Sequence, residues 1–317
     1  MSPATRTPAP RAALCLLLLA GAAACGGRDA AADAAPAEPS DSAAAVSVTD
    51  DAGRTVTLTR PARRIVALLP AVTETLFAMG AGDRMVGRTD YDTDGYAADL
   101  PSVGGGLDPS LEALAALRPD LVIAWETAGG ATLRHRLERL GIPVFAVRTQ
   151  DTADVYENLE RLGRLTAHER GADSVARAMR RGLDAVRASV ADLPRPTVLY
   201  VVGTDPPMTA GPATFVAELI GVAGGRSVFP EVRQEWPQLS LEEIVRRQPE
   251  VVIVPVSAGA EPPPLARLPG WRELRSVRKG RVEIVDGDLL NRPGPRLDAA
   301  ARALRAAIHG VDAGAER

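Results

Sequence analysis

The feature that most constrains this chain is a fifteen-residue stretch that occurs twice. Positions 110–124 have the sequence SLEALAALRPDLVIA, and positions 240–254 have the sequence SLEEIVRRQPEVVIV. Six of the aligned positions are identical, whereas average composition gives any one position under roughly a one-in-ten chance of identity. Each copy predicts a short helix, a turn that contains proline and a buried strand. The repeat therefore predicts two similar lobes, and a cleft between lobes is a common binding place for a small ligand.

Composition and net charge are those of an ordinary globular protein. The 317 residues suffice for two domains, and 46% of them are hydrophobic and 24% charged. The net charge of −3 provides no electrostatic basis for binding nucleic acid, so we expect no such partner.

The N-terminus has the pattern of a secretory signal peptide. Arg6 and Arg11 precede the apolar run Ala12–Ala20, which is too short to cross a bilayer as a permanent helix. Small residues then lead to Cys25, and this sequence resembles a bacterial lipobox in which Ala22 replaces the usual leucine. We therefore expect Cys25 to be lipidated and to anchor an extracytoplasmic protein, on the periplasmic or outer face of the cell membrane. The alternative is ordinary signal cleavage, which would leave a soluble protein.

The remaining chain divides into a tether, two lobes and one long helix. Residues 26–45 lack apolar periodicity, which is typical of a disordered tether. From Ala172 to Leu193, apolar residues recur every three or four positions, as on one face of a helix. Strand and helix patterns alternate on both sides of this segment, so we predict an α/β fold: two lobes with mostly parallel sheets, joined by one long connecting helix. The predicted boundaries are 1–25 for the signal peptide, 26–45 for the tether, 46–168 for the N-terminal lobe, 169–194 for the connecting helix and 195–317 for the C-terminal lobe.

Residues that could bind a metal or carry out catalysis are sparse. His135, His168 and His309 have no ligand spacing, so we predict no metal site. Ser276 and Lys279 match the S-x-x-K motif of penicillin-recognising enzymes, but the companion S-D-N and K-T-G motifs are missing from the sequence. We therefore predict no catalysis, and a cell-envelope enzyme that uses Ser276 and Lys279 remains the alternative from another functional class.

Aromatic residues make up only 3% of the chain, so the position of each one is informative. Trp125 ends a predicted strand, and ligands in open α/β sheets bind beyond the carboxyl ends of the strands. Trp236 lies in a loop that leads into a helix, and Tyr91 lies in an acidic loop. Such positions suit a large, flat, partly apolar ligand. For Trp125, a side chain buried in the core is an equally good interpretation. Trp271 is predicted to pack in the core of the second lobe.

Glu112 and Glu242 occupy the same position in the two copies of the repeat, in the first turn of each predicted helix. An acidic residue there stabilises a helix by complementing its dipole. That effect does not require an acid at the same position in both lobes. One matched carboxylate per lobe could instead bind a two-fold symmetric basic partner.

Five segments together resemble the periplasmic cobalamin-binding proteins of ABC importers, which belong to the helical-backbone class of substrate-binding proteins. These segments are RIVALLPAVTETLFAMG, VGRTDYDTDGYAADLPSVGG, SLEALAALRPDLVIAW, GTDPPMTAG and WPQLSLEEIVRRQPEVVIV. The resemblance covers residues 46–308. Its strand and repeat motifs are shared with the iron-siderophore and haem binders of the class, whereas the W-P-Q-x-S-x-E and D-P-P-x-T-x-G segments are more particular to the cobalamin branch.

The resemblance implies roles for individual residues in ligand binding. The ligand aromatics of the family fall on Tyr91, Trp125 and Trp236, whereas a Phe of the family falls on Met208 and a Trp falls on Gly106. Methionine can still pack against a macrocycle. The change at Gly106 leaves the ligand open between a corrinoid, a ferric siderophore and haem.

The resemblance also implies a partner. The transporter-docking glutamates of the family fall on Glu112 and Glu242, where they pair with arginines of the membrane permease. We therefore expect an extracytoplasmic solute-binding lipoprotein that captures cobalamin in the interlobe cleft and delivers it to an ABC permease dimer. We expect a monomer without a cofactor of its own, because the corrinoid is the transported ligand.

Overall fold

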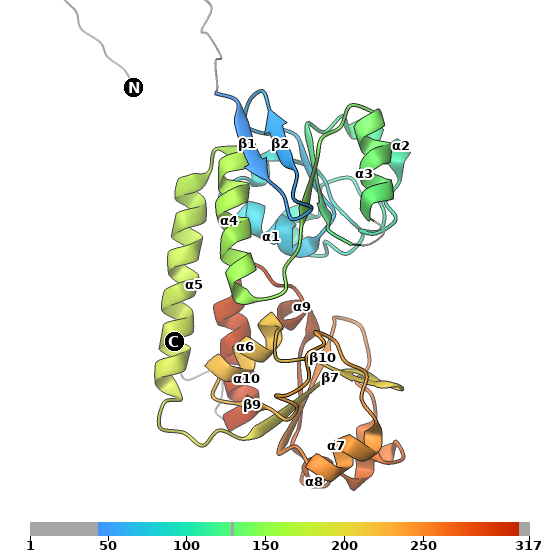
Figure 1. The fold of residues 1–317 in the computed structure, drawn as a ribbon, viewed down its shortest axis with the longest axis vertical. Coiled ribbons are helices and arrows are strands. Elements are labelled where there is room, and N and C mark those ends of the chain that lie inside the picture. The colour runs from blue at the N-terminus through green and yellow to red at the C-terminus, as the bar shows by residue number, and fades with distance from the viewer. Residues whose placement is uncertain (1–43, 128–129, 311–317) are drawn as a thin grey trace, which may run out of the picture. The chain divides into compact units, whose positions relative to one another are not determined.

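The computed structural model describes residues 44–127 and 130–310. All of the described helices and strands belong to one compact unit, Ser42–Arg317. Within it, two α/β lobes lie one above the other, and helix α5 (Glu169–Ser189) runs along both of them (Figure 1). The predicted fold, two lobes with mostly parallel sheets joined by one long helix, is confirmed.

The N-terminal lobe contains a parallel sheet of strand order β4-β3-β5-β6 and a hairpin, β1-β2. Helix α4 is an addition to the predicted elements, and it packs against α5. The elements of this lobe are β1 (Val46–Thr49), β2 (Thr55–Leu58), β3 (Ile65–Ala67), α1 (Pro70–Ala78), η1 (Gly82–Arg84), β4 (Met85–Gly87), η2 (Gly95–Ala97), α2 (Leu111–Leu117), β5 (Leu121–Trp125), α3 (Gly130–Arg139), β6 (Val144–Val147) and α4 (Thr152–Thr166).

The C-terminal lobe contains a sheet of strand order β11-β10-β7-β8, and β9 also pairs with β7. All of its pairings are parallel except that of β8, which folds back on the end of β7. The elements are β7 (Thr197–Thr204), β8 (Pro207–Thr209), α6 (Phe215–Val222), β9 (Arg226–Ser227), α7 (Leu241–Arg247), β10 (Val251–Val256), η3 (Leu265–Arg267), η4 (Trp271–Glu273), α8 (Arg275–Arg278), β11 (Val282–Asp286), α9 (Gly287–Leu290) and α10 (Leu297–His309).

The two copies of the repeat form the same local structure, α2-β5 in one lobe and α7-β10 in the other. The Oγ atoms of Ser110 and Ser240 cap the two helices, each accepting a backbone N–H three residues later at 3.2 Å. Both helices end in a left-handed residue, Arg118 with φ 44° and Gln248 with φ 48°. The repeat therefore encodes one scaffold unit twice, as its sequence predicts.

Both faces of each sheet are buried. Successive residues of a strand point to opposite faces, so Ile65 packs in a core with α4, α5 and α10, while Val66 packs toward α2 and α3. The second lobe repeats this arrangement, with Ile253 in the shared core and Val252 in a separate core that includes α7. The helices of the repeat thus cover the outer face of each sheet, and the long helix covers the inner face.

Two glycines bring the backbone of α5 close to each lobe in turn. A Cβ atom at Gly171 would lie 1.9 Å from the carbonyl oxygen of Met79, at the end of α1. A Cβ atom at Gly182 would lie 2.5 Å from the Cβ atom of Asp298, in α10. The helix is therefore packed tightly on both lobes. Among the described helices, none has the length and apolar character that a membrane-spanning helix needs.

The close approach at Gly171 has a measurable consequence. We expect Gly171→Ala to lower the free energy of unfolding by about 1–3 kcal/mol, because the added methyl group forces α5 away from α1. Urea denaturation measures this change. Gly221→Ala in α6 is the matched control: a Cβ atom there would meet nothing within 4 Å, and the substitution should be neutral or raise stability by up to about 1 kcal/mol. Equal stability of the Gly171 variant and the unmodified protein would contradict the tight contact.

Candidate functional site

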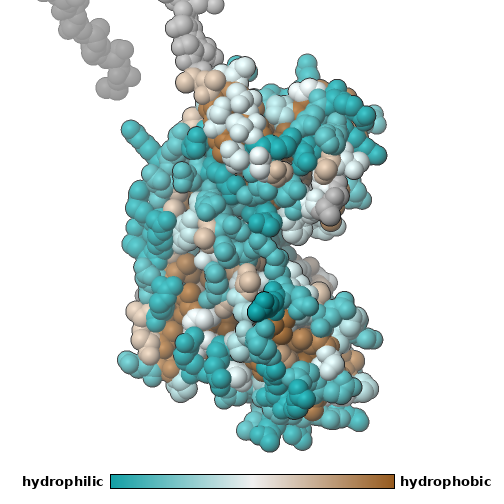
Figure 2. All heavy atoms as spheres, viewed as in Figure 1, coloured by the Kyte–Doolittle hydropathy of each residue, from teal (hydrophilic) through white to brown (hydrophobic). Residues whose placement is uncertain are grey.

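A pocket of about 500 Å³ lies between the two lobes. Figure 2 shows the molecule hollowed on the side opposite α5. The N-terminal lobe supplies most of the lining, and the C-terminal lobe adds Phe215, Trp236, Asn291, Arg292 and Pro293. Both the size and the largely apolar lining are those of a small-molecule site.

The structure brings together three of the predicted ligand residues, Tyr91, Trp125 and Trp236, around this pocket. Their side chains are 63%, 50% and 39% exposed, so their ring faces are free for contact with a ligand. The Trp125 side chain is therefore not buried in a hydrophobic core. Trp271 is only 2% exposed and packs in the core of the C-terminal lobe, as predicted.

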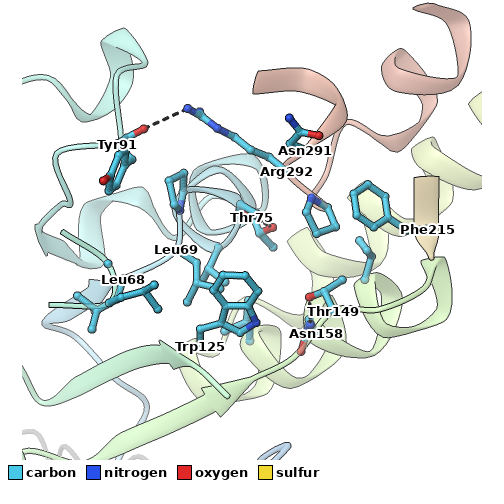
Figure 3. Close-up of a pocket in the computed structure, with 18 of the residues that line it drawn as sticks. Leu68, Leu69, Thr75, Tyr91, Trp125, Thr149, Asn158, Phe215, Asn291 and Arg292 are labelled. Carbon is cyan, nitrogen blue, oxygen red and sulfur yellow. Dashed lines mark hydrogen bonds between the residues drawn. The ribbon is translucent and has the colours of Figure 1, made fainter. Parts of the chain in front are cut away.

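The backbone around the aromatic residues sets their positions. Trp125 is the last residue of β5, where it pairs with Val147 of β6, so its side chain stands at the carboxyl edge of the sheet (Figure 3). The loop of Tyr91 is held by the buried carboxylate of Asp92, which accepts hydrogen bonds from the backbone N–H and the hydroxyl of Thr89 at 2.7 and 2.6 Å.

Met208 is the predicted ligand residue that the structure leaves outside the pocket lining. It lies in β8, and its backbone pairs with Gln238, next to the loop that carries Trp236. The same loop is held by the N–H of Gly211, which donates to the carbonyl of Glu235 at 2.7 Å. Strand β8 therefore supports the Trp236 loop, a role that the sequence did not reveal because the prolines of this segment favoured a loop.

Gly106 lies in the pocket wall, and the neighbouring main chain leaves no room for a side chain at this position. A Cβ atom there would lie 2.3 Å from the carbonyl oxygen of Leu68, directly after β3. A tryptophan therefore does not fit at this position unless the main chain moves. The next residue, Leu107, lines the pocket with a side chain that is 69% exposed.

Arg292 is a charged lining residue that the sequence gave no reason to expect at the pocket. Its guanidinium crosses from the C-terminal lobe to the N-terminal lobe and donates to the carbonyl of Tyr91 at 3.1 Å (Figure 3). Three carboxylates also surround it, those of Glu74 and Asp94 at 3.4 Å and that of Asp288 at 3.2 Å. Nothing in the sequence distinguishes this arginine from the many others, because its partners in the N-terminal lobe lie about 200 residues away.

Glu74 and Arg296 join the two lobes close to this arginine. Arg296 donates to both carboxylate oxygens of Glu74, from Nε at 3.0 Å and from Nη2 at 2.7 Å. Burial raises the pKa of Glu74 above its ordinary value, and the hydrogen bonds from Arg296 oppose that shift. Elsewhere between the lobes, the N–H of Phe215 donates to the carbonyl of Gln150 at 2.7 Å. These links hold the pocket walls in one arrangement.

The predicted docking residues lie outside the pocket. Glu112 and Glu242 are exposed in the first turns of α2 and α7, and neither forms an ion pair with another described residue. Figure 1 places α2 and α7 on the same side of the molecule, opposite α5. Each carboxylate is therefore free to meet a partner.

The residues considered for other chemistry do not form a site. Ser276 is 2% exposed and its Oγ has no hydrogen-bond partner, whereas Lys279 is exposed, so the two side chains do not form an accessible nucleophile and base. Among the residues that the structure describes, no group of His, Cys, Asp or Glu could hold a metal ion. Cys25 lies outside the described residues.

Comparison with known proteins identifies the family. Residues 65–289 match the family model described as periplasmic binding protein. The vitamin B12-binding protein of Vibrio parahaemolyticus is 30% identical over 240 residues, which cover 74% of this chain and 86% of the relative. An uncharacterized ABC transporter substrate-binding lipoprotein of Bacillus subtilis is 30% identical over 261 residues, which cover 80% of this chain and 82% of the relative.

Solved structures agree with this match. The crystal structure of the periplasmic vitamin B12-binding protein of Vibrio cholerae is similar with a TM-score of 0.65 and 26% identity, over 78% of this chain and 97% of that one. A periplasmic haem-binding protein from Pseudomonas aeruginosa has a TM-score of 0.68 and 27% identity, over 78% of this chain and 93% of that one. The small molecule held by such a binding protein is a transported ligand and not a cofactor. The chain therefore belongs to the periplasmic binding protein family, the substrate-binding components of ABC importers, and it has the helical-backbone (class III) fold of that family.

Proposed function

We propose that this protein captures a corrinoid, cobalamin, in the interlobe pocket and delivers it to an ABC permease. The main support for this function is the aromatic lining of the pocket. Tyr91 and Trp125 from one lobe and Trp236 from the other surround a largely apolar space with exposed rings. A large macrocycle with apolar faces and amide-bearing edges suits such a lining. The vitamin B12-binding relatives support the same ligand.

The charge of the pocket favours a corrinoid over haem. Among the described residues that line the pocket, Arg292 is the only cation, and three carboxylates within 3.4 Å already compensate it. No free cation therefore lines the pocket, within the part of the chain that the structure describes, to receive the carboxylates of haem. Haem iron is held by His, Cys, Met or Tyr, and Tyr91 is the only residue of these types in the described part of the lining.

Docking and membrane anchoring depend on three further residues, Glu112, Glu242 and Cys25. Glu112 and Glu242, one exposed carboxylate per lobe, pair with arginines of the two-subunit permease. Cys25 carries a lipid that holds the protein on the extracytoplasmic face of the membrane, and the lipoprotein relative supports this assignment. We propose that the protein works as a monomer and without catalysis, and the burial of Ser276 supports the latter point.

Titration of the compact unit Ser42–Arg317 with cyanocobalamin tests the ligand. We expect saturable quenching of tryptophan fluorescence at protein concentrations of about 1 µM, because Trp125 and Trp236 line the pocket. Equilibrium dialysis serves as the control for light absorbed by the ligand. Haem and a ferric hydroxamate siderophore are the competing ligands. No binding of cyanocobalamin, together with tight binding of either competitor, would replace the corrinoid with that competitor.

A further inference from the structure

A concentration of positive charge lies at the end of the C-terminal lobe that is farther from the N-terminal lobe. Within 13 residues of sequence, 267–279, this segment holds five cations and one acid, Glu273, in a chain whose net charge is −3. All five cationic side chains are exposed. We call them the basic patch: Arg267, Arg272, Arg275, Arg278 and Lys279.

The charges of the basic patch are not neutralised within the molecule. No side chain of the patch forms an ion pair with any carboxylate of residues 44–127 and 130–310, whereas Arg246 and Arg247 on the adjacent helix both pair with Glu243. Arg275 and Arg278 follow the i, i+3 spacing and share one face of α8, and Lys279 directly follows the helix. The patch is therefore a surface of uncompensated positive charge.

The backbone under the basic patch is firmly held. Trp271 is buried, and its Nε1 donates to the carbonyl of Thr204 at 3.3 Å. The N–H of Arg275 donates to the side-chain oxygen of Gln248, at the end of α7, at 2.8 Å. At the other end of α7, a Cβ atom on Gly270 would lie 2.3 Å from Cδ2 of Leu241. The segment from Gly270 to Arg275 is thus held against both ends of α7.

Leu241 is followed by Glu242, so the segment that carries the basic patch packs against the helix of this docking carboxylate. Figure 1 shows α7 and α8 side by side at the end of the C-terminal lobe, and Figure 2 shows that hydrophilic residues cover this end. A binding protein that docks on a membrane permease through α7 brings α8 close to the lipid around that permease. Clusters of four to eight Arg and Lys side chains bind anionic phospholipid surfaces.

We propose that the basic patch contacts anionic phospholipid headgroups of the membrane while the protein delivers its ligand. The basis of this contact is charge, because exposed guanidinium groups without an ion pair donate hydrogen bonds to phosphate oxygens. This contact adds a lipid-dependent attachment beside the docking carboxylate, and it needs neither the lipid anchor nor a bound ligand.

Sedimentation with lipid vesicles tests the proposal on the compact unit Ser42–Arg317, which lacks Cys25. We expect binding to vesicles of phosphatidylcholine with phosphatidylglycerol, weaker binding as salt is added, and little binding to pure phosphatidylcholine. The triple variant Arg272→Glu, Arg275→Glu, Arg278→Glu should bind the anionic vesicles at least about tenfold more weakly. Its binding of cyanocobalamin should not change, so this test is separate from that of the ligand.

The matched control is Arg170→Glu, Arg177→Glu, Arg181→Glu, which makes the same change of net charge on exposed residues of α5. This control should keep most of the vesicle binding. Equal loss in the two triple variants would show that net charge alone acts, and it would overturn the proposal. Equal binding to neutral and anionic vesicles would also overturn it. The triple variant of the patch could also keep its binding to anionic vesicles and lose its binding to the detergent-solubilised permease. That result would overturn the proposal as well, because the patch would then contact protein.

Discussion

Reversing both Glu112 and Glu242 to arginine is expected to abolish ligand uptake and leave ligand binding unchanged. Each carboxylate is exposed and lies outside the pocket lining, so neither substitution disturbs the bound ligand. In the docked complex, each substitution would place an arginine of this protein against an arginine of the permease. Removal of one partner of a buried charge pair costs about 2–5 kcal/mol, and repulsion adds to that cost. We therefore expect uptake into cells or proteoliposomes to fall by at least about a hundredfold for the double variant.

The control for this result is Glu160→Arg with Asp173→Arg, two exposed acids on α4 and α5. These helices lie on the side of the molecule opposite α2 and α7 (Figure 1), so uptake should remain near its normal rate. Normal uptake by the variant with Glu112 and Glu242 reversed would mean that the two carboxylates only complement their helix dipoles. Thermal unfolding of each variant checks that the effect does not come from loss of fold.

Truncating the aromatic rings of the pocket is expected to give the largest loss of ligand affinity. Trp125 and Trp236 come from different lobes, and each exposes a ring face that a bound macrocycle would cover. A buried aromatic contact at the centre of a binding site contributes about 2 kcal/mol or more, so each alanine variant should weaken cyanocobalamin binding by roughly 30-fold. We expect the double variant to show no binding at micromolar concentrations of protein and ligand.

Trp271 provides an internal control, because it is 2% exposed and packs in the core of the C-terminal lobe. A variant with Trp125→Phe and Trp236→Phe keeps Trp271 as its only tryptophan and keeps an aromatic ring at each pocket position. It should still bind cyanocobalamin in equilibrium dialysis, with weaker quenching of its fluorescence. If the two alanine variants bind cyanocobalamin with unchanged affinity, neither tryptophan side chain contacts the ligand.

Elements with strong local patterns were predicted correctly. The long helix and both copies of the repeat have patterns that act over a few residues of sequence, and all of them form in the structure. Strand β8 escaped prediction because Pro206 and Pro207 favour a loop, and it forms only because β7 offers a pairing edge. Arg292 escaped for a similar reason, since each of its contacts in the N-terminal lobe lies about 200 residues away in the sequence.

The sequence by itself determined the scaffold: two similar lobes, one long helix and a matched glutamate on each lobe. Those features depend on periodicity and local turn chemistry, which act over a few residues. Only the tertiary structure decided which side chains meet between the lobes. It brought Tyr91, Trp125 and Trp236 around one pocket, left Met208 outside it and compensated Arg292 with three carboxylates. These outcomes depend on how two separately built lobes are packed against α5, and no local pattern carries that information.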